Sequence, residues 1–570
     1  MKLNSGERRR TFLIFIFFCL WVLLIGASLV KIQVFEYGKN LAKVQAQSNR
    51  TFTLHSKRGT IYDSSGEVLA ISVKAKSAFL NNKDKADSLR IFNRILRQNI
   101  YLSRDDKQNI KKRIHQGDKF IWIKRKLSDA EYRRLKKTAS VDQDRMQSGL
   151  DFIEEYTRMY PQNATACHIL GGVGIDEQGL GGIEYSLDDI LRGKNCKVKV
   201  VRDARQKAFK LQYLEKPQDG KDIYLTIDSS LQFFVEKELE AAVKKHNAKS
   251  GTVIVMDSRD GAILAMAGFP NFNPIDLKYT SPGVIKNKAI SFLYHPGSTF
   301  KIILAATALE QNLCSPQQPF FCYNGVYKIK DQVLTDEKPY DYLTFEEIII
   351  YSSNIGAARI GELLGRKKYY EGINRFGFGT QTGLLLPAEE RGIVNPLDKW
   401  SGVSLDFLAY GYEIAVTPIQ MVRAFNVIAN DGCMIQPYIA KAIAGVVLKR
   451  AQPQKILSPG TVVRMKAIME EVVKRGTGKT TRIEGIPVAG KTGTTKKISK
   501  NKSTMYYISS FGGFFPANRP RVTMFIVIDE PKGQFYGGDV AAPLFKSIAE
   551  RLSIYLKIFP EVDKTNEIKL

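Results

Sequence analysis

The chain has 570 residues and a formal net charge of +28, with 44% hydrophobic and 25% charged residues. Its length exceeds that of one ordinary domain, and its composition excludes an intrinsically disordered chain. The positive charge predicts an anionic partner such as membrane lipid, wall polymer or nucleic acid. The sequence has no recognisable nucleic-acid-binding module, so nucleic acid is not the expected partner. No spacing of cysteines and histidines is typical of zinc, so no metal site is expected.

A membrane anchor is predicted near the N-terminus. The run Thr11–Val30 is uncharged and long enough to span a bilayer. The arginines at 8–10 precede it and predict that residues 1–10 stay in the cytoplasm, although lysines also follow the run. A cleaved signal peptide ending near Gly26-Ala27-Ser28 is the alternative, but the run is longer than a usual signal core. The rest of the chain is therefore expected on the outer face of the cytoplasmic membrane.

A non-catalytic region is predicted at 31–220. The polar sequence from Lys31 to about Arg50 predicts a helix leading away from the membrane, and short strand patterns then alternate with charged helical patterns. Lysines and arginines are concentrated at 111–137. A solvated helical face is the simplest interpretation of this stretch, and contact with a membrane surface or wall polymer is the alternative.

The remainder, 221–557, has the pattern of one α+β domain followed by a tail at 558–570. Strands are predicted at Thr252–Asp257, Ala262–Ala267, Tyr507–Phe515 and Arg521–Ile528. With a strand leading into Lys491, they predict an antiparallel sheet of about five strands. A helix is predicted at Ser230–Lys245, and the last helix, about Ala541 to Leu556, should pack on this sheet.

Ser298 and Lys301 form a Ser-x-x-Lys pair at the start of an apolar helix predicted at Phe300–Leu309. On a helix the two side chains lie on one face, a turn apart. A serine hydroxyl is a weak nucleophile until a base takes its proton, and lysine serves as that base when burial or nearby positive charge lowers its pKa. The same spacing occurs twice elsewhere in the chain, so the pair alone is weak evidence.

A second motif, Ser352-Ser353-Asn354, precedes the apolar helical run Ile355–Leu364. The hydroxyl of Ser352 can relay a proton between a nucleophile and a leaving amine. The amide of Asn354 can hydrogen-bond both Lys301 and a substrate amide.

A third motif, Lys491-Thr492-Gly493-Thr494, follows a segment that is typical of an edge strand. A peptide can bind along such an edge as an added strand. Gly493 would let a substrate backbone approach, Thr492 and Thr494 would hold a carboxylate, and Lys491 would add positive charge. Helix caps, turns and surface charge explain each motif alone, but not the three in this order.

The ordered motifs resemble those of penicillin-binding proteins and class A β-lactamases, in which the middle motif is usually Ser-Asp-Asn. Four other blocks extend the resemblance beyond the motifs. They are Arg58–Asp63 with Gly66 and Leu69-Ala70, Gly182-Ile183-Glu184, Arg202-Asp203, and Leu225–Asp228 with Leu231-Gln232. With them the chain resembles a class B penicillin-binding protein, a membrane-anchored peptidoglycan D,D-transpeptidase. The segment Tyr536–Phe545 is most similar to the septal, cell-division branch of that family.

The resemblance implies a dimerisation-type pedestal domain at 31–220 and a penicillin-binding transpeptidase domain at 221–557, its five-stranded sheet flanked by helices. Its implied catalytic residues are Ser298 as the acylated serine, Lys301 as general base, Ser352, Asn354 and Lys491, with Thr492, Gly493 and Thr494 binding substrate. The backbone N–H groups of Ser298 and Thr494 would form an oxyanion hole. The implied partners are stem peptides ending in D-Ala-D-Ala, β-lactams as covalent inhibitors, and a membrane-embedded glycosyltransferase with other division proteins. No cofactor is implied.

The sequence leaves alternative functions open. The rival functions are an elongation-type transpeptidase, a β-lactamase using Glu389 or Glu390 to activate water, and an inactive β-lactam sensor or scaffold.

His295 stands where the family often has glutamate before Pro-Gly-Ser, and we expect it to be a packed or solvated histidine. Cys314 and Cys322 are close enough in sequence for a disulfide, with free buried cysteines as the simpler expectation. The acceptor amine and the oligomeric state are not predicted.

Overall fold

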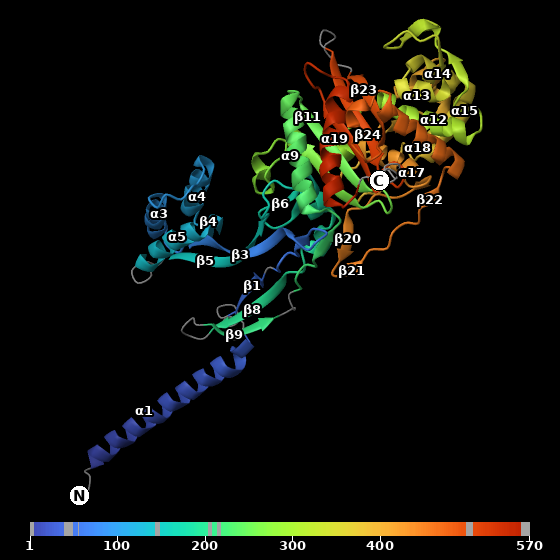
Figure 1. Ribbon diagram of the computed structural model, residues 1–570. Coiled ribbons are helices and arrows are strands. Elements are labelled where there is room, and N and C mark those ends of the chain that lie inside the picture. The colour runs from blue at the N-terminus through green and yellow to red at the C-terminus, as the bar shows by residue number, and fades with distance from the viewer. Residues whose placement is uncertain are drawn as a thin grey trace, which may run out of the picture. The chain divides into compact units, whose positions relative to one another are not determined.

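The computed structural model describes residues 5–38, 49–54, 56–142, 149–202, 208–213, 218–497 and 505–559 (Figure 1). The chain forms two compact units. The first consists of residues 1–57 and 193–220, and the second of residues 58–192 and 221–570.

The first unit contains the apolar helix α1, Ser5–Val30, which continues into a π-helical turn at Lys31–Phe35. Within the described residues it is the one helix long and apolar enough to cross a membrane. The predicted polar helix is wrong at its end, because Arg50 lies in strand β1, Asn49–Leu54. Its residues 39–48 lie outside the described residues.

Strand β1 forms a three-stranded antiparallel sheet with β8, Cys196–Arg202, and β9, Ala208–Tyr213. The tertiary pairing with β8, from Asn49 opposite Val201 to Leu54 opposite Cys196, supplies the backbone hydrogen bonds that a helix would otherwise make. Asp203 of the Arg202-Asp203 block lies outside the described residues.

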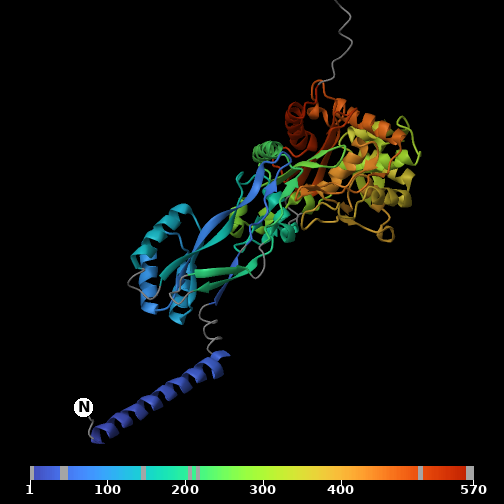
Figure 2. The same ribbon diagram turned by 90° about the horizontal axis from the view of Figure 1, so that it is seen from below.

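The pedestal part of the second unit is built on the long strand β3, Val68–Asn81, which pairs antiparallel with both β4, Phe120–Leu127, and β5, Gly149–Met159. Three helices pack on this sheet (Figure 2). They are α3, Lys85–Leu96, α4, Arg104–Gln116, and α5, Asp129–Asp142. Their buried residues include Ile91, Phe92, Ile114 and Leu135, while Lys111 and Lys112 of α4 are exposed. The basic stretch therefore has a solvated helical face, as the simpler interpretation predicts.

A buried ion-pair network joins two of the family-like blocks. The Nε of Arg58 and the Nε of Arg158 each lie 2.6 Å from a different carboxylate oxygen of Glu184. Arg58 also contacts Asp188 at 2.5 Å. Glu184 is completely buried in the short helix α7, Gly182–Ser186, and the two arginines are almost so. A buried carboxylate needs such partners, because an unpaired charge in the interior is very costly.

The pedestal sheet continues into the C-terminal domain within the second unit. Strand β10, Ile223–Leu225, pairs parallel with β2, Ile61–Tyr62, and antiparallel with β20, Ala440–Ile443. The carboxylate of Asp63 accepts hydrogen bonds from the N–H and hydroxyl of Ser229, at 3.1 and 2.7 Å. Two segments far apart in sequence are thereby held together at the start of the next helix.

The C-terminal domain contains the predicted antiparallel sheet of five strands, in the order β12-β11-β25-β24-β23. Its strands are β11, Ser250–Asp257, β12, Ile263–Phe269, β23, Ala489–Lys497, β24, Tyr506–Phe515, and β25, Val522–Asp529. In the described part of the chain, β23 pairs on one side only, with β24. It is therefore the edge strand that the sequence predicts, and it contains the whole Lys-Thr-Gly-Thr motif.

Helices cover both faces of this sheet. On one face α9, Ser229–Lys245, packs beside α19, Gly537–Tyr555 (Figure 1). The helix α19 begins at Gly537 rather than near Ala541. Glycine is expected to break helices, but here it permits close packing, since a Cβ on Gly537 would lie 2.4 Å from the carbonyl oxygen of Gly493.

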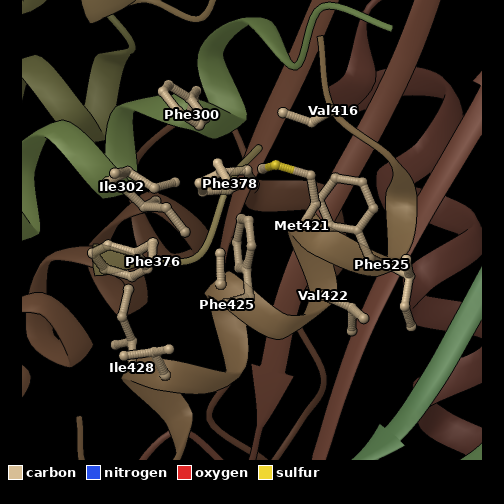
Figure 3. Close-up of a cluster of buried hydrophobic side chains, with 14 of the residues drawn as sticks. Phe300, Ile302, Phe376, Phe378, Val416, Met421, Val422, Phe425, Ile428 and Phe525 are labelled. Atoms are coloured by element: carbon tan, nitrogen blue, oxygen red, sulfur yellow. The ribbon is translucent and has the colours of Figure 1, made fainter. Parts of the chain in front are cut away.

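A lobe of helices covers the other face of the sheet (Figure 1). Its main helices are α12, Lys301–Glu310, α13, Phe345–Tyr351, α14, Asn354–Leu364, α15, Arg366–Arg375, α16, Ser404–Ala409, α17, Pro418–Ala429, and α18, Pro459–Lys474. Aromatic and aliphatic side chains from these helices meet the sheet in one core, where Phe300 and Phe378 pack near Phe425 and Phe525 (Figure 3). This core holds the start of α12 in place, and Ser298 and Lys301 with it.

Candidate active site

Ser298 lies in a tight 3-10 turn, Gly297–Phe300, that leads directly into α12. Gly297 has a φ of 56°, and a Cβ there would lie 2.6 Å from Oγ1 of Thr495 on β23. Glycine is thus required both by the backbone and by the close approach of the strand. The turn presents Ser298 half-exposed beside β23, while its neighbour Thr299 is buried. In the described structure the Ser298 hydroxyl makes no hydrogen bond, so its oxygen is open to an incoming group.

Lys301 is fully buried one turn after Ser298. Its Nζ donates hydrogen bonds to the carbonyl oxygen of Ser352 at 2.6 Å, to Oδ1 of Asn354 at 2.9 Å, and to Oγ of Ser352 at 3.4 Å. Burial lowers the pKa of Lys301 to about 7, against the opposing effect of Asp336 and Glu337. A large fraction of the amine is therefore uncharged at neutral pH and able to accept a proton.

Ser352 lies between two lysines. It ends helix α13 in the left-handed conformation, with a φ of 66°, and this places its side chain between the first and third motifs. The Nζ of Lys491 donates to Oγ of Ser352 at 2.9 Å, opposite the longer contact from Lys301. The structure thus brings together Lys301, Ser352, Asn354 and Lys491, which lie on three separate segments of the chain.

Lys491 is also fully buried, on the edge strand β23. Its pKa is well below the ordinary value because of burial and because of the charge of Lys301. The sequence left burial and nearby positive charge as the two possible causes of a lowered pKa at Lys301. In the structure burial is the largest cause of the lowered pKa at both lysines, and repulsion between the two ammonium groups adds to it at Lys491.

The remaining residues of the third motif lie along the same strand. Oγ1 of Thr492 is 2.6 Å from Oγ1 of Thr477, and Oγ1 of Thr494 accepts a hydrogen bond from the N–H of Gly537 at 2.9 Å. A Cβ on Gly493 would lie 2.5 Å from Oγ of Ser510, so packing beneath the strand requires this glycine. Packing alone therefore explains the glycine at 493, without the close approach by substrate that the sequence suggested.

Asp336 is a site residue that the motifs did not reveal. Its carboxylate accepts hydrogen bonds from the Ser353 hydroxyl at 2.5 Å, and from the N–H groups of Asn354 and Ile355 at 2.5 and 3.1 Å. The neighbouring carbonyl of Thr335 accepts a hydrogen bond from the Asn354 side-chain amide at 3.1 Å. These contacts orient α14 from its N-terminus and turn Oδ1 of Asn354 toward Lys301. Nothing in the local sequence pairs Asp336 with a motif seventeen residues later.

The contacts of Glu389 and His295 give neither residue a role in catalysis. The Glu389 carboxylate accepts hydrogen bonds from the N–H and hydroxyl of Thr382, at 2.5 and 2.6 Å, and so closes a local loop. The Nδ1–H of His295 donates to the carbonyl oxygen of Ile414 at 2.7 Å, and its ring stacks on Tyr412. His295 is therefore a packed histidine, as expected.

Cys314 and Cys322 are both free and buried. The predicted alternative of a disulfide between them is not formed in this structure. Burial raises the pKa of both thiols, to about 11 for Cys314, as expected for unreactive core cysteines.

Comparison with known proteins decides the family. Residues 251–550 match the penicillin binding protein transpeptidase domain, and residues 53–225 match the penicillin-binding protein dimerisation domain. The chain belongs to the class B penicillin-binding proteins. This confirms the predicted family and the predicted α+β fold, in which a transpeptidase domain follows a dimerisation domain.

Several members of this family are similar over most of their length. Stage V sporulation protein D of Bacillus subtilis is 32% identical, covering 96% of this chain and 85% of the relative. Peptidoglycan D,D-transpeptidase FtsI of Escherichia coli K12 is 30% identical, covering 91% and 87%. Penicillin-binding protein 3 of Mycobacterium tuberculosis, solved with aztreonam, is 25% identical with a TM-score of 0.69, covering 90% and 98%.

Proposed function

We propose that this class B penicillin-binding protein is a peptidoglycan D,D-transpeptidase of the FtsI type, with Ser298 as its nucleophile. Ser298 attacks the carbonyl of the penultimate D-Ala of a stem peptide, the terminal D-Ala leaves, and an acyl-enzyme forms. An amine of a neighbouring stem then takes the acyl group and completes the cross-link. The reaction needs no metal or organic cofactor. β-Lactams resemble the D-Ala-D-Ala end and acylate the same serine.

The observation that carries this proposal is that Oγ of Ser352 lies between two buried lysines, Lys491 and the Lys301 that follows Ser298 by one turn. Lys301, with a pKa of about 7, takes the Ser298 proton as general base. Ser352 passes that proton to the leaving amine, and Asn354 holds Lys301 in place. Lys491 donates a hydrogen bond to the Ser352 hydroxyl at the other end of the relay.

The edge strand β23 is proposed to bind the donor peptide as an added strand. Thr492 and Thr494 hold its carboxylate, and Gly493 lies between them in the strand. The N–H groups of Ser298 and Thr494 stabilise the developing oxyanion.

The nucleophile is tested by labelling the full-length protein with a fluorescent penicillin. The wild type should label persistently, and Ser298→Ala should not label. Ser281→Ala, which changes an exposed serine, is the matched control and should label normally. Equal labelling of Ser298→Ala and wild type would refute the assignment, and rapid release of hydrolysed penicillin by the wild type would favour a β-lactamase.

The anchor and the domains complete the proposal. Residues 11–30 of helix α1 span the cytoplasmic membrane once, with residues 1–10 in the cytoplasm and the rest of the chain outside. Residues 31–220 are the non-catalytic pedestal, residues 221–557 the transpeptidase domain, and residues 558–570 a tail. A membrane-embedded glycosyltransferase that makes the glycan strands is the proposed partner, together with other division proteins, because cross-linking requires newly polymerised strands.

A septal role is supported by the segment Tyr536–Phe545 and by the similarity to FtsI. Depletion of the protein should then block division while growth continues, so cells should form filaments in time-lapse microscopy. Round cells would instead indicate an elongation-type transpeptidase. An unrelated depleted membrane protein serves as the control.

A further inference from the structure

A pocket of about 580 Å³ opens at the end of the five-stranded sheet where β23 begins. Its wall includes the turn at 516–521, which joins β24 to β25, and the loop at 485–487, which leads into β23. The N–H of Ala517 in the turn donates a hydrogen bond to the carbonyl oxygen of Pro487 in the loop at 2.7 Å. The three motifs all lie in the described part of the chain, and none of their residues lines this pocket. It is therefore separate from the candidate active site.

The wall of this pocket carries positive charge that is only partly compensated. Arg259 and Lys466 are each paired with an aspartate, at 2.6 and 2.8 Å. Arg519 and Arg521 also line the pocket, and neither has an ion-pair partner among the described residues. The Nε of Arg521 is buried without any hydrogen-bond partner in the described structure. Because a guanidinium matches the planar fork of a carboxylate, the pocket offers two uncommitted carboxylate-binding groups.

Apolar surface lies beside these guanidinium groups. Pro487, Pro516 and Pro520 line the pocket, and so does Phe559, whose side chain is 77% exposed. A proline ring is rigid and its residue has no N–H to donate, so these segments offer a ligand apolar contact rather than backbone hydrogen bonds. An inorganic anion would leave this surface unused, whereas the volume is in the range that organic ligands fill. The wall thus fits a ligand that carries an apolar group next to a carboxylate.

We infer that this pocket binds an acidic peptide segment of a partner protein, with a carboxylate on Arg519 and Arg521 and a neighbouring apolar side chain on Phe559 and the prolines. The carboxylate supplies the acceptor that the Nε of Arg521 lacks, and this donor is already shielded from water in the free protein. A polyphosphate chain brings more negative charge than two free guanidinium groups neutralise, and Asp431 on the same wall repels it. The inference does not depend on the acyl-serine reaction, because the pocket contains no motif residue.

The test measures the binding of two fluorescent peptides to the full-length protein in micelles of a neutral detergent, by fluorescence anisotropy. The acidic probe is Gly-Glu-Phe-Glu-Gly with both ends blocked, and the neutral probe has glutamine in place of each glutamate. The two probes share their shape and their apolar side chain and differ only in the carboxylates. The acidic probe should bind at least about tenfold more tightly, and its affinity should fall as the ionic strength rises. Equal affinity for the two probes would overturn the inference.

Two variants locate the binding. Arg519→Ala and Arg521→Gln should each weaken binding of the acidic probe about tenfold, because each removes a hydrogen bond between charged groups, and should leave binding of the neutral probe unchanged. Arg464→Ala removes an exposed arginine of α18 that does not line the pocket, and this matched control should change neither affinity. Thermal unfolding shows that each variant is folded, and Arg519 is exposed, so its replacement leaves the core intact. Wild-type affinity of Arg519→Ala for the acidic probe would contradict the assignment.

Two further measurements distinguish other occupants of the pocket. Inorganic phosphate is added as a competitor, and it should not displace the acidic probe when the two are at equal concentration. Displacement would assign the pocket to phosphate and overturn the inference. Glu561 and Asp563 follow Phe559 closely in sequence and lie outside the described residues. If the acidic probe binds only to the double variant Glu561→Gln/Asp563→Asn, the chain's own acidic residues are the occupant, and the inference of a partner protein is wrong.

Discussion

Lys301 shows how the interior of a protein changes the chemistry of a single residue. A lysine in water holds its proton firmly at neutral pH and cannot act as a base. The complete burial of Lys301 disfavours its charged form, whereas the three oxygen acceptors around its Nζ still fix the position of the amine. Position and basicity are thus obtained from the same environment.

The pH dependence of acylation follows from this shift. Because the pKa of Lys301 is lowered to about 7, its neutral, proton-accepting form increases as the pH rises through 7. The second-order rate constant for penicillin acylation should rise about tenfold per pH unit between pH 5 and 6.5, and level off above pH 8. Stopped-flow fluorescence measures this rate. A profile flat from pH 5 to 9 would contradict the role of Lys301 as base.

At the scale of elements, the hairpin of β14, Val326–Ile329, and β15, Gln332–Thr335, positions the second motif from outside it. Asp336 follows β15 directly and bonds the first residues of α14. The catalytic geometry at Asn354 therefore depends on a hairpin that carries none of the three motifs. Because Asp336 fixes the N-terminus of α14, the position of Asn354 beside Lys301 does not depend on the lysines alone.

Loss of the Asp336 carboxylate should weaken this positioning. Asp336→Ala should slow penicillin acylation about tenfold or more, because hydrogen bonds to a charged group contribute about 1.5–3 kcal/mol each. Asp336→Asn keeps one acceptor oxygen, so its acylation rate should lie between those of Asp336→Ala and the wild type. The control Asp341→Ala removes an exposed carboxylate nearby and should acylate normally. Equal rates for Asp336→Ala and wild type, at equal thermal stability, would exclude a positioning role.

At the scale of the whole molecule, the second unit is held together by buried polar contacts as well as by its apolar cores. Glu184 is enclosed between Arg58 and Arg158, and Asp63 bonds the start of α9. Arg58, Asp63 and Glu184 belong to the family-like blocks at 58–63 and 182–184. Their contacts give those blocks a structural explanation that is independent of the catalytic site.

Removal of the Glu184 side chain should destabilise the protein strongly, since it leaves two buried arginines without their shared partner. Glu184→Ala should lower the free energy of unfolding by about 3–5 kcal/mol. Glu154→Ala breaks exposed ion pairs with Lys74 and Lys76 and should cost at most about 1 kcal/mol. The two variants are compared by their urea-unfolding midpoints. Similar small shifts for both would show that the buried network contributes little.

Much of this architecture could be predicted from the sequence. The anchor follows from the length of one uncharged run, and the strands at 252–257 and 507–515 and the helix at Ser230–Lys245 follow from local residue pattern. Boundaries failed where tertiary contacts override local preference. Arg50 lies in a strand because β8 pairs with it, and α19 starts at Gly537 because close packing against β23 favours glycine there.

The sequence by itself determined the family, the order of the three motifs and the likeness of each segment to a helix or a strand, because these depend on residue type and short spacing. Only the tertiary structure decided which groups meet. Lys301 contacts the Ser352 hydroxyl across 51 residues, and Lys491 reaches the same hydroxyl across 139. The pKa of Lys301 and the contribution of Asp336 both arise from burial and distance in space, which no local pattern in the chain encodes.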